Sequence, residues 1–100
     1  MRQIYAEEVT KHVRLTILRV LVDSNDWRAN ESILATMVDE MGISVDRPKV
    51  VEEICWLEAA GLVEVTDISG FLIAQCTEEG MQVARGRKTY EGVRRPHKKS

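Results

Sequence analysis

Residues 46 to 65 constrain the fold more than any other part of the sequence, because they combine a helix start, a helix stop and the beginning of a strand. Asp46 is suited to cap a helix N-terminus, and Pro48 is tolerated in the first turn that follows. Gly61 supplies the left-handed backbone conformation with which many helices end. Between them, apolar residues recur at helical spacing as one stripe: Val50, Ile54 and Leu57. The pattern predicts a helix over residues 46–60 that passes directly into a strand.

Two further helices are predicted before this stretch. Residues 5–23 carry a long helical pattern, and the polar segment 23–30 that follows favours turns, so we expect it to be a loop. Asn30 is a natural N-cap for a second helix that ends at Gly42. The buried face of that helix is predicted to contain Ile33, Leu34, Met37, Val38 and Met41. The short turn after Gly42 joins the second and third helices at the spacing of a helix-turn-helix.

A β-hairpin and a last helix follow the third helix. Residues 62–67 and 71–76 alternate between apolar and polar side chains and flank a short connection with Gly70, as in a tight hairpin. Thr77 caps the last helix, which ends at Gly86. The predicted fold is therefore mainly α with a small β-hairpin: a winged helix-turn-helix with a three-helix core, a two-stranded wing and a C-terminal helix.

The first helix is apolar on two faces. One face gathers Val9, Val13, Ile17, Val20 and Leu21. The nearly opposite face gathers Leu15, Leu18 and Val22. This second face is covered either by the hairpin and last helix of the same chain or by a second subunit. The latter alternative predicts a homodimer in which Leu15, Leu18 and Val22 lie near the two-fold axis.

Composition and charge predict one soluble domain followed by a basic tail. The 100 residues are 44% hydrophobic and 30% charged, which is enough for a single core. Residues 1–84 contain seven basic and fifteen acidic residues, a net charge of −8, whereas residues 85–100 contain seven basic residues and one acidic residue, a net charge of +6. We therefore expect a winged-helix domain over residues 1–86 and a flexible basic tail over residues 87–100.

Several classes of protein are disfavoured by the sequence. No apolar run reaches the roughly 18 residues of a membrane span, and the N-terminus lacks the apolar block of a signal peptide, so we expect a cytoplasmic protein without membrane contact. Cys55 and Cys76 lack CxxC spacing, which predicts buried or half-buried thiols and no metal site. His12 and His97 are far in sequence from any nucleophile or metal-ligand pattern, so we expect neither an enzyme nor a cofactor.

Two resemblances to known families rest on specific motifs. The motif Leu57-Glu58-Ala59-Ala60-Gly61-Leu62-Val63, followed by Thr77-Glu78-Glu79-Gly80, resembles winged-helix transcription regulators of the arsenic-repressor and multiple-antibiotic-resistance kinds over residues 9–86. The segments Trp27-Arg28-Ala29-Asn30-Glu31-Ser32, Trp56-Leu57 and Gly92-Val93-Arg94-Arg95-Pro96 resemble a family of small proteins encoded in Mu-like phages and prophages. This second resemblance implies a winged-helix fold and a phage or prophage origin, hence the cytoplasm of a bacterial host, but it supplies no biochemical activity.

The resemblance to regulators predicts a transcriptional regulator that binds double-stranded DNA. In a helix-turn-helix the second helix enters the major groove, which would bring Arg47 and Lys49 to base edges or phosphates. Further cations that we expect on phosphates are Arg28, Arg87, Lys88, Arg94, Arg95, Lys98 and Lys99.

The charge distribution favours an alternative function, a protein–protein interaction module of phage morphogenesis or regulation that does not bind DNA directly. The outer face of the third helix is expected to present Glu52 and Glu53, and the wing tip contains Asp67 but no Lys or Arg, so both would repel a polyanion. Trp56 lies opposite the apolar stripe of its helix. It is therefore an exposed anchor for a phage or host protein, or it is covered by the wing or by an ordered tail.

Overall fold

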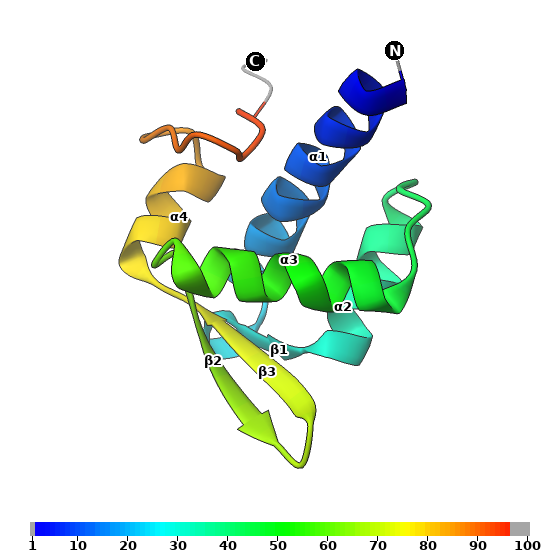
Figure 1. Cartoon of the computed structure of the whole chain (residues 1–100). Coiled ribbons are helices and arrows are strands. Elements are labelled where there is room, and N and C mark those ends of the chain that lie inside the picture. Colours follow the sequence, from blue (N-terminus) through cyan, green and yellow to red (C-terminus); the bar gives the residue numbers. More distant parts are fainter. Residues whose placement is uncertain (1, 97–100) are drawn as a thin grey trace.

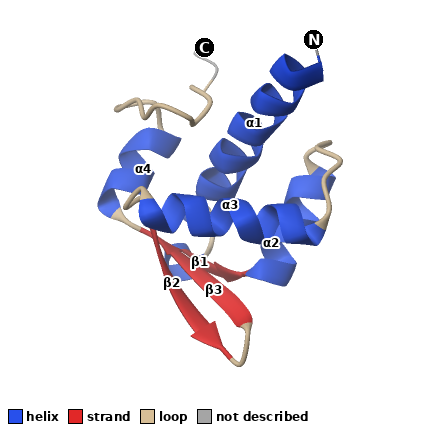
Figure 2. Ribbon diagram, viewed as in Figure 1, coloured by secondary structure: helices blue, strands red, loops and turns tan. Residues whose placement is uncertain are grey.

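The helices form one body from which a small antiparallel sheet projects (Figure 1, Figure 2). The computed structural model describes residues 2–96. Along the chain the elements are α1 (Arg2–Val22), the 3-10 helix η1 (Asn25–Trp27), β1 (Arg28–Asn30), α2 (Glu31–Glu40), α3 (Arg47–Ala59), β2 (Val63–Ile68), β3 (Phe71–Cys76) and α4 (Glu78–Ala84). This order is the predicted winged helix-turn-helix with one additional strand, and none of these helices is long and apolar enough to cross a membrane.

Three side-chain caps determine where the later helices begin. The Asn30 side chain accepts a hydrogen bond from the Ile33 N–H at 2.8 Å, and that of Asp46 accepts one from the Lys49 N–H at 3.0 Å. The Thr77 hydroxyl accepts one from the Gly80 N–H at 3.0 Å. Each bond satisfies a donor that has no partner inside the helix. All three predicted caps are confirmed.

Helix α1 runs through the centre of the body and is covered on both apolar faces by its own chain. It packs against α2, α3, α4 and β3. Leu18 is fully buried and Leu15 is only 6% exposed, while Val22 is half-buried. The predicted two-fold contact through Leu15, Leu18 and Val22 is therefore wrong, because α4 and the sheet occupy the space that a second subunit would need.

The sheet has three strands, in the order β1-β3-β2. Strand β1 was expected to be part of a loop, but it pairs antiparallel with β3, with Asn30 opposite Ile73. Three residues are too few to show a period of two, so this strand has no sequence signature. The β2–β3 hairpin turns at Ser69 and Gly70, whose φ angles of 54° and 83° match the left-handed conformation of a two-residue hairpin turn.

Residues 87–96, here called the C-terminal segment, pack on the helical body. Val93 is buried, and the Arg94 N–H donates a hydrogen bond to the Lys11 carbonyl of α1 at 3.3 Å. The expected flexible tail is therefore wrong for this segment, because Val93 supplies an apolar anchor that the basic composition conceals. Residues 97–100 lie outside the described part of the chain.

The two cysteines differ in their surroundings. Cys76 of β3 is buried, and this burial raises the pKa of its thiol from 9.0 to about 11. Cys55 is exposed on α3. The expected burial is confirmed for Cys76 and wrong for Cys55.

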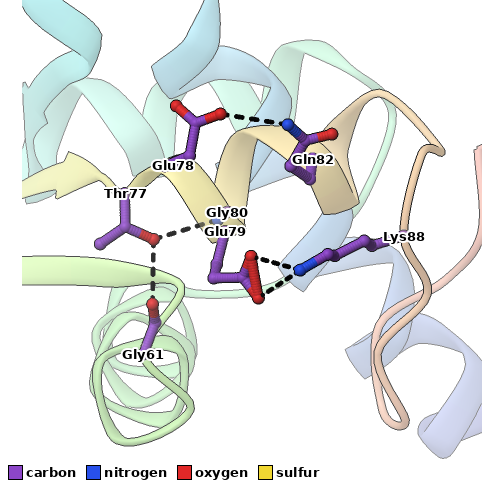
Figure 3. Close-up of polar contacts among 7 residues, drawn as sticks. All are labelled: Gly61, Thr77, Glu78, Glu79, Gly80, Gln82 and Lys88. Atoms are coloured by element: carbon purple, nitrogen blue, oxygen red, sulfur yellow. Dashed lines mark hydrogen bonds and ion pairs between the residues drawn. The ribbon is translucent and has the colours of Figure 1, made fainter.

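Gly80 of α4 lies against the backbone of Leu62, directly after the turn that ends α3. A Cβ at this position would overlap the Leu62 carbonyl oxygen and lie 2.8 Å from the Cys76 sulfur. The Thr77 hydroxyl, which caps α4, also donates to the Gly61 carbonyl at 2.9 Å (Figure 3). The first turn of α4 is thus fixed directly on the glycine turn that ends α3.

We predict that Gly80→Ala lowers the free energy of unfolding by about 1–3 kcal/mol, because the added methyl group meets backbone that must shift. Urea denaturation measures the change. Glu79→Ala is the matched control on the same turn, since Glu79 makes only an exposed ion pair with Lys88 at 2.7 Å (Figure 3) and its loss should change stability by less than about 0.5 kcal/mol. Equal stability of the two variants would contradict the close packing of α4.

Candidate nucleic-acid interface

The outer side of α3 and the tip of the hairpin form the surface that a winged helix offers to a ligand, here called the α3–wing surface. From α3 it contains Arg47, Val51, Glu52, Cys55 and Glu58, and from the hairpin Ile68 and Phe71. All are exposed except Val51, which is half-buried. The Arg47 guanidinium lies 5.5 Å from the centroid of the Phe71 ring, so it joins the start of α3 to the wing.

A buried carboxylate holds Arg47 in this place. Glu31, the first residue of α2, is only 8% exposed. One of its oxygens accepts a hydrogen bond from the Arg47 Nε at 3.1 Å, and the other accepts one from the Leu72 N–H of β3 at 2.7 Å. Leu72 is the next residue of β3 beyond the last β1–β3 pair, Asn30 with Ile73. The chain becomes helical after Asn30, so the Glu31 side chain takes the place of strand backbone as the acceptor for the Leu72 N–H.

The structure separates the two residues that were predicted to contact bases. The Lys49 Nζ pairs with Glu53 at 2.9 Å, and its side chain lines the groove between α1 and the α2–α3 turn. Residues two apart on a helix point in different directions, so Lys49 does not share the face of Arg47. Glu53 was expected on the outer face, but it is 2% exposed and also bonds to the Arg14 Nε at 2.6 Å. On α3, Glu52 and Glu58 carry the negative charge of the α3–wing surface, with Arg47 as its cation.

Trp56 is covered by the C-terminal segment. Tyr90 meets its ring edge to face, with centroids 5.8 Å apart, and a Cβ at Gly92 would lie 2.9 Å from the indole. The Arg14 guanidinium lies 3.7 Å from the ring centroid and donates from Nη1 to the Gly92 carbonyl at 2.9 Å. Of the alternatives for Trp56, cover by an ordered tail is the one observed, and the residue is half-buried within one chain.

The remaining predicted phosphate contacts are scattered over the molecule. Arg28 is exposed on β1, opposite Gln75 of β3 in the strand register. Lys88 pairs with Glu79 at 2.7 Å, Arg87 contacts the Met81 sulfur at 3.9 Å, Arg94 is half-buried and Arg95 is exposed. Lys98 and Lys99 lie outside the described residues. Among the described residues, these cations do not form one basic stripe around the α3–wing surface. Phe71 of that surface, and Glu31 that holds Arg47 in it, were not identified from the sequence.

Comparisons with known proteins give relatives and a fold neighbour. No family model matches the sequence. Protein gp26 of Escherichia phage Mu is 43% identical over 88 residues, which cover 88% of this chain and 91% of gp26. The chain belongs to the family of Mu gp26. A protein of Haemophilus influenzae strain Rd is 32% identical to this gp26 relative over 79 residues, covering 78% of the chain and 76% of that protein.

A solved structure similar to this gp26 relative is that of a MarR family transcriptional regulator from Streptomyces coelicolor. The TM-score is 0.58 at 23% sequence identity, with 84% of this chain and 61% of that chain covered. At this identity the likeness shows the fold alone, and it agrees with the winged helix described above.

We predict that Arg14→Ala lowers the free energy of unfolding by about 3 kcal/mol and releases the C-terminal segment. The substitution leaves the buried Glu53 carboxylate with Lys49 as its remaining cation, and breaking a buried ion pair is costly. Urea denaturation gives the stability, and hydrogen exchange of the Arg94 amide reports the segment. Arg28→Ala, which removes an exposed arginine from β1, is the control. Unchanged exchange at Arg94 in Arg14→Ala would contradict this role of Arg14.

Proposed function

We propose that this relative of gp26 is a DNA-binding transcriptional regulator that acts in the cytoplasm of the bacterial host and carries out no catalysis. The observation that supports this most is the position of Arg47. Its half-exposed guanidinium lies at the N-terminal end of α3 beside the wing, which is where helix-turn-helix proteins contact base edges. The α3–wing surface is also open to a ligand, since nothing in residues 2–96 covers it.

The charges of the α3–wing surface determine the expected kind of binding. Glu52 and Glu58 repel phosphates, so the sequence-independent part of the affinity should be weak. Phosphate contacts would then come from cations outside this surface, among them Arg28 and Arg95, and from the basic residues at the end of the chain. The protein should therefore bind tightly only to those DNA sites in which Arg47 makes its base contact.

We predict selective binding of the protein to fragments of its own phage or prophage genome, with a loss of at least about tenfold in Arg47→Ala. Fluorescence anisotropy with labelled fragments at low salt measures it, and the affinity should fall steeply as salt rises. Arg85→Ala removes an exposed cation from the end of α4 and is the control, expected to bind as tightly as the unmodified protein. Absence of any sequence-selective binding at low salt would remove the proposed function.

A second candidate function, a protein-interaction module without DNA contact, is favoured by the apolar and acidic residues on the same surface. Ile68 is 55% exposed and Phe71 37% exposed, beside the carboxylates of α3. The exposed Cys55 allows a direct comparison, because a photo-crosslinker attached to it lies on the α3–wing surface while the buried Cys76 stays unlabelled. Crosslinking in an extract that contains phage DNA should give DNA adducts for a regulator and only protein adducts for an interaction module.

We further propose that the protein is a homodimer, held not by the second face of α1 but by the face that α1 and α2 leave uncovered. Three large apolar side chains are exposed there: Tyr5, Ile33 and Met41. The charges along the grooves of this face have both signs, with Glu8 near one end and Arg19 near the other. An antiparallel two-fold pairing of α1 helices brings each Glu8 toward the partner's Arg19, as a self-complementary contact requires.

We predict that Tyr5→Glu converts the dimer to a monomer, because Tyr5 is 73% exposed on the proposed contact and a carboxylate there would be buried without a partner. Sedimentation velocity at micromolar concentration measures the oligomeric state. Ile68→Glu is the control, since Ile68 is an exposed apolar residue on the wing and its change should leave the dimer intact. A monomeric unmodified protein, or a dimer that survives Tyr5→Glu, would contradict the proposed contact.

A further inference from the structure

We infer that Arg47 reads a guanine base in the major groove, and that Glu31 and Phe71 are positioning residues that orient it before DNA arrives. The inference rests on the proposed DNA binding and adds the base that is recognised. It begins from the way in which the guanidinium is held.

Two contacts fix the plane of the Arg47 guanidinium. The Nε atom donates to the Glu31 carboxylate at 3.1 Å, and the ring of Phe71 lies 5.5 Å from the guanidinium carbon. Neither contact uses the terminal nitrogens. Within residues 2–96, no hydrogen bond or ion pair joins either Nη atom of Arg47 to another side chain, so both remain available as parallel donors.

This arrangement fits guanine better than it fits a phosphate. The O6 and N7 atoms of guanine are two acceptors in one plane, and the end of a guanidinium matches both at once. A phosphate can also accept two parallel donors from a guanidinium, so the geometry of the fork alone does not separate the two kinds of acceptor, and the charge of the surface decides between them. Glu52 and Glu58 on the same face also oppose the approach of the backbone more than the approach of a neutral base edge.

Glu31 is suited to orient Arg47 because it cannot move easily. Its side chain is 8% exposed, its second oxygen is bonded to the Leu72 N–H at 2.7 Å, and its backbone begins α2 directly after the Asn30 cap. A side chain held in this way loses little conformational entropy when the base binds. The same carboxylate also ties the wing to α3, so the position of the reading residue depends on that of the hairpin.

The test uses DNA sites selected from a random library by the unmodified protein. We expect one position of the selected site to be guanine in nearly all sequences. Arg47→Lys keeps the charge but loses the two parallel donors, so it should bind the selected site about 5- to 150-fold more weakly and random DNA equally well. Replacing that guanine by 7-deazaguanine, which lacks the N7 acceptor, should weaken the unmodified protein and have little further effect on Arg47→Lys. Arg85→Lys, at an exposed arginine after α4, is the matched control and should behave as the unmodified protein.

A second variant tests the positioning role of Glu31. Glu31→Gln keeps an acceptor for the Leu72 N–H but removes the negative charge beside Arg47, so the fold should persist, as circular dichroism would show. We expect the preference for guanine over the other bases to fall several-fold while the salt dependence of binding stays the same. A structural role alone would weaken all sites equally and leave the base preference intact.

The outcomes separate the two proposals. The proposed recognition of guanine is overturned if the selected site has no guanine whose effect depends on Arg47. It is also overturned if Arg47→Lys loses the same affinity on all DNA. In either case DNA binding remains, with Arg47 on a phosphate. If no DNA is selected at all, the proposed function fails, and the proposed recognition of guanine by Arg47 fails with it.

Discussion

The ion pair between Arg14 and Glu53 joins three parts of the chain that are far apart in sequence. Arg14 belongs to α1 and Glu53 to α3, and the same guanidinium bonds to Gly92 of the C-terminal segment. Because Glu53 is almost fully buried, its charge is tolerable only while Arg14 and Lys49 remain beside it. The orientation of α3 relative to α1, and with it the direction in which the α3–wing surface faces, therefore depends on this polar contact as well as on the apolar core.

The parts of the fold that follow from local chemistry were predictable. The caps at Asn30, Asp46 and Thr77 each involve atoms three residues apart, and the hairpin turn lies between two strands that are neighbours in sequence. What covers each helix face was not predictable, because periodicity shows that a face is apolar but not which segment lies on it. The second face of α1 was assigned to another subunit for this reason. Glu53 was placed in solvent because its partner Arg14 is 39 residues away and local spacing gives no sign of the pair.

In the candidate site, too, the local features were predictable and the contacts between distant segments were not. The position of Arg47 follows from the helix-turn-helix pattern, whereas its pairing with Glu31 and Phe71 depends on how the hairpin returns to the start of α2. Half-buried Arg14 left no signal of its pairing, since it stands in a mixed stretch between His12 and Thr16 and its partner Glu53 is 39 residues away. Strand β1 also left no signal in the sequence, because Arg28–Asn30 contains one apolar residue and two polar ones.

Residues 28–31 combine several of these functions in four consecutive positions. Arg28–Asn30 completes the sheet, Asn30 caps α2, and Glu31 binds both the wing and Arg47. An inserted or deleted residue here would shift the strand register by one or rotate Glu31 by about 100° around the axis of α2, and either change would separate the carboxylate from its two partners. Many amino acids can stand at Arg28 without consequence for these contacts, but the number of residues between the strand and the helix is fixed. In this segment evolution can vary the residue at position 28 but has no freedom in length.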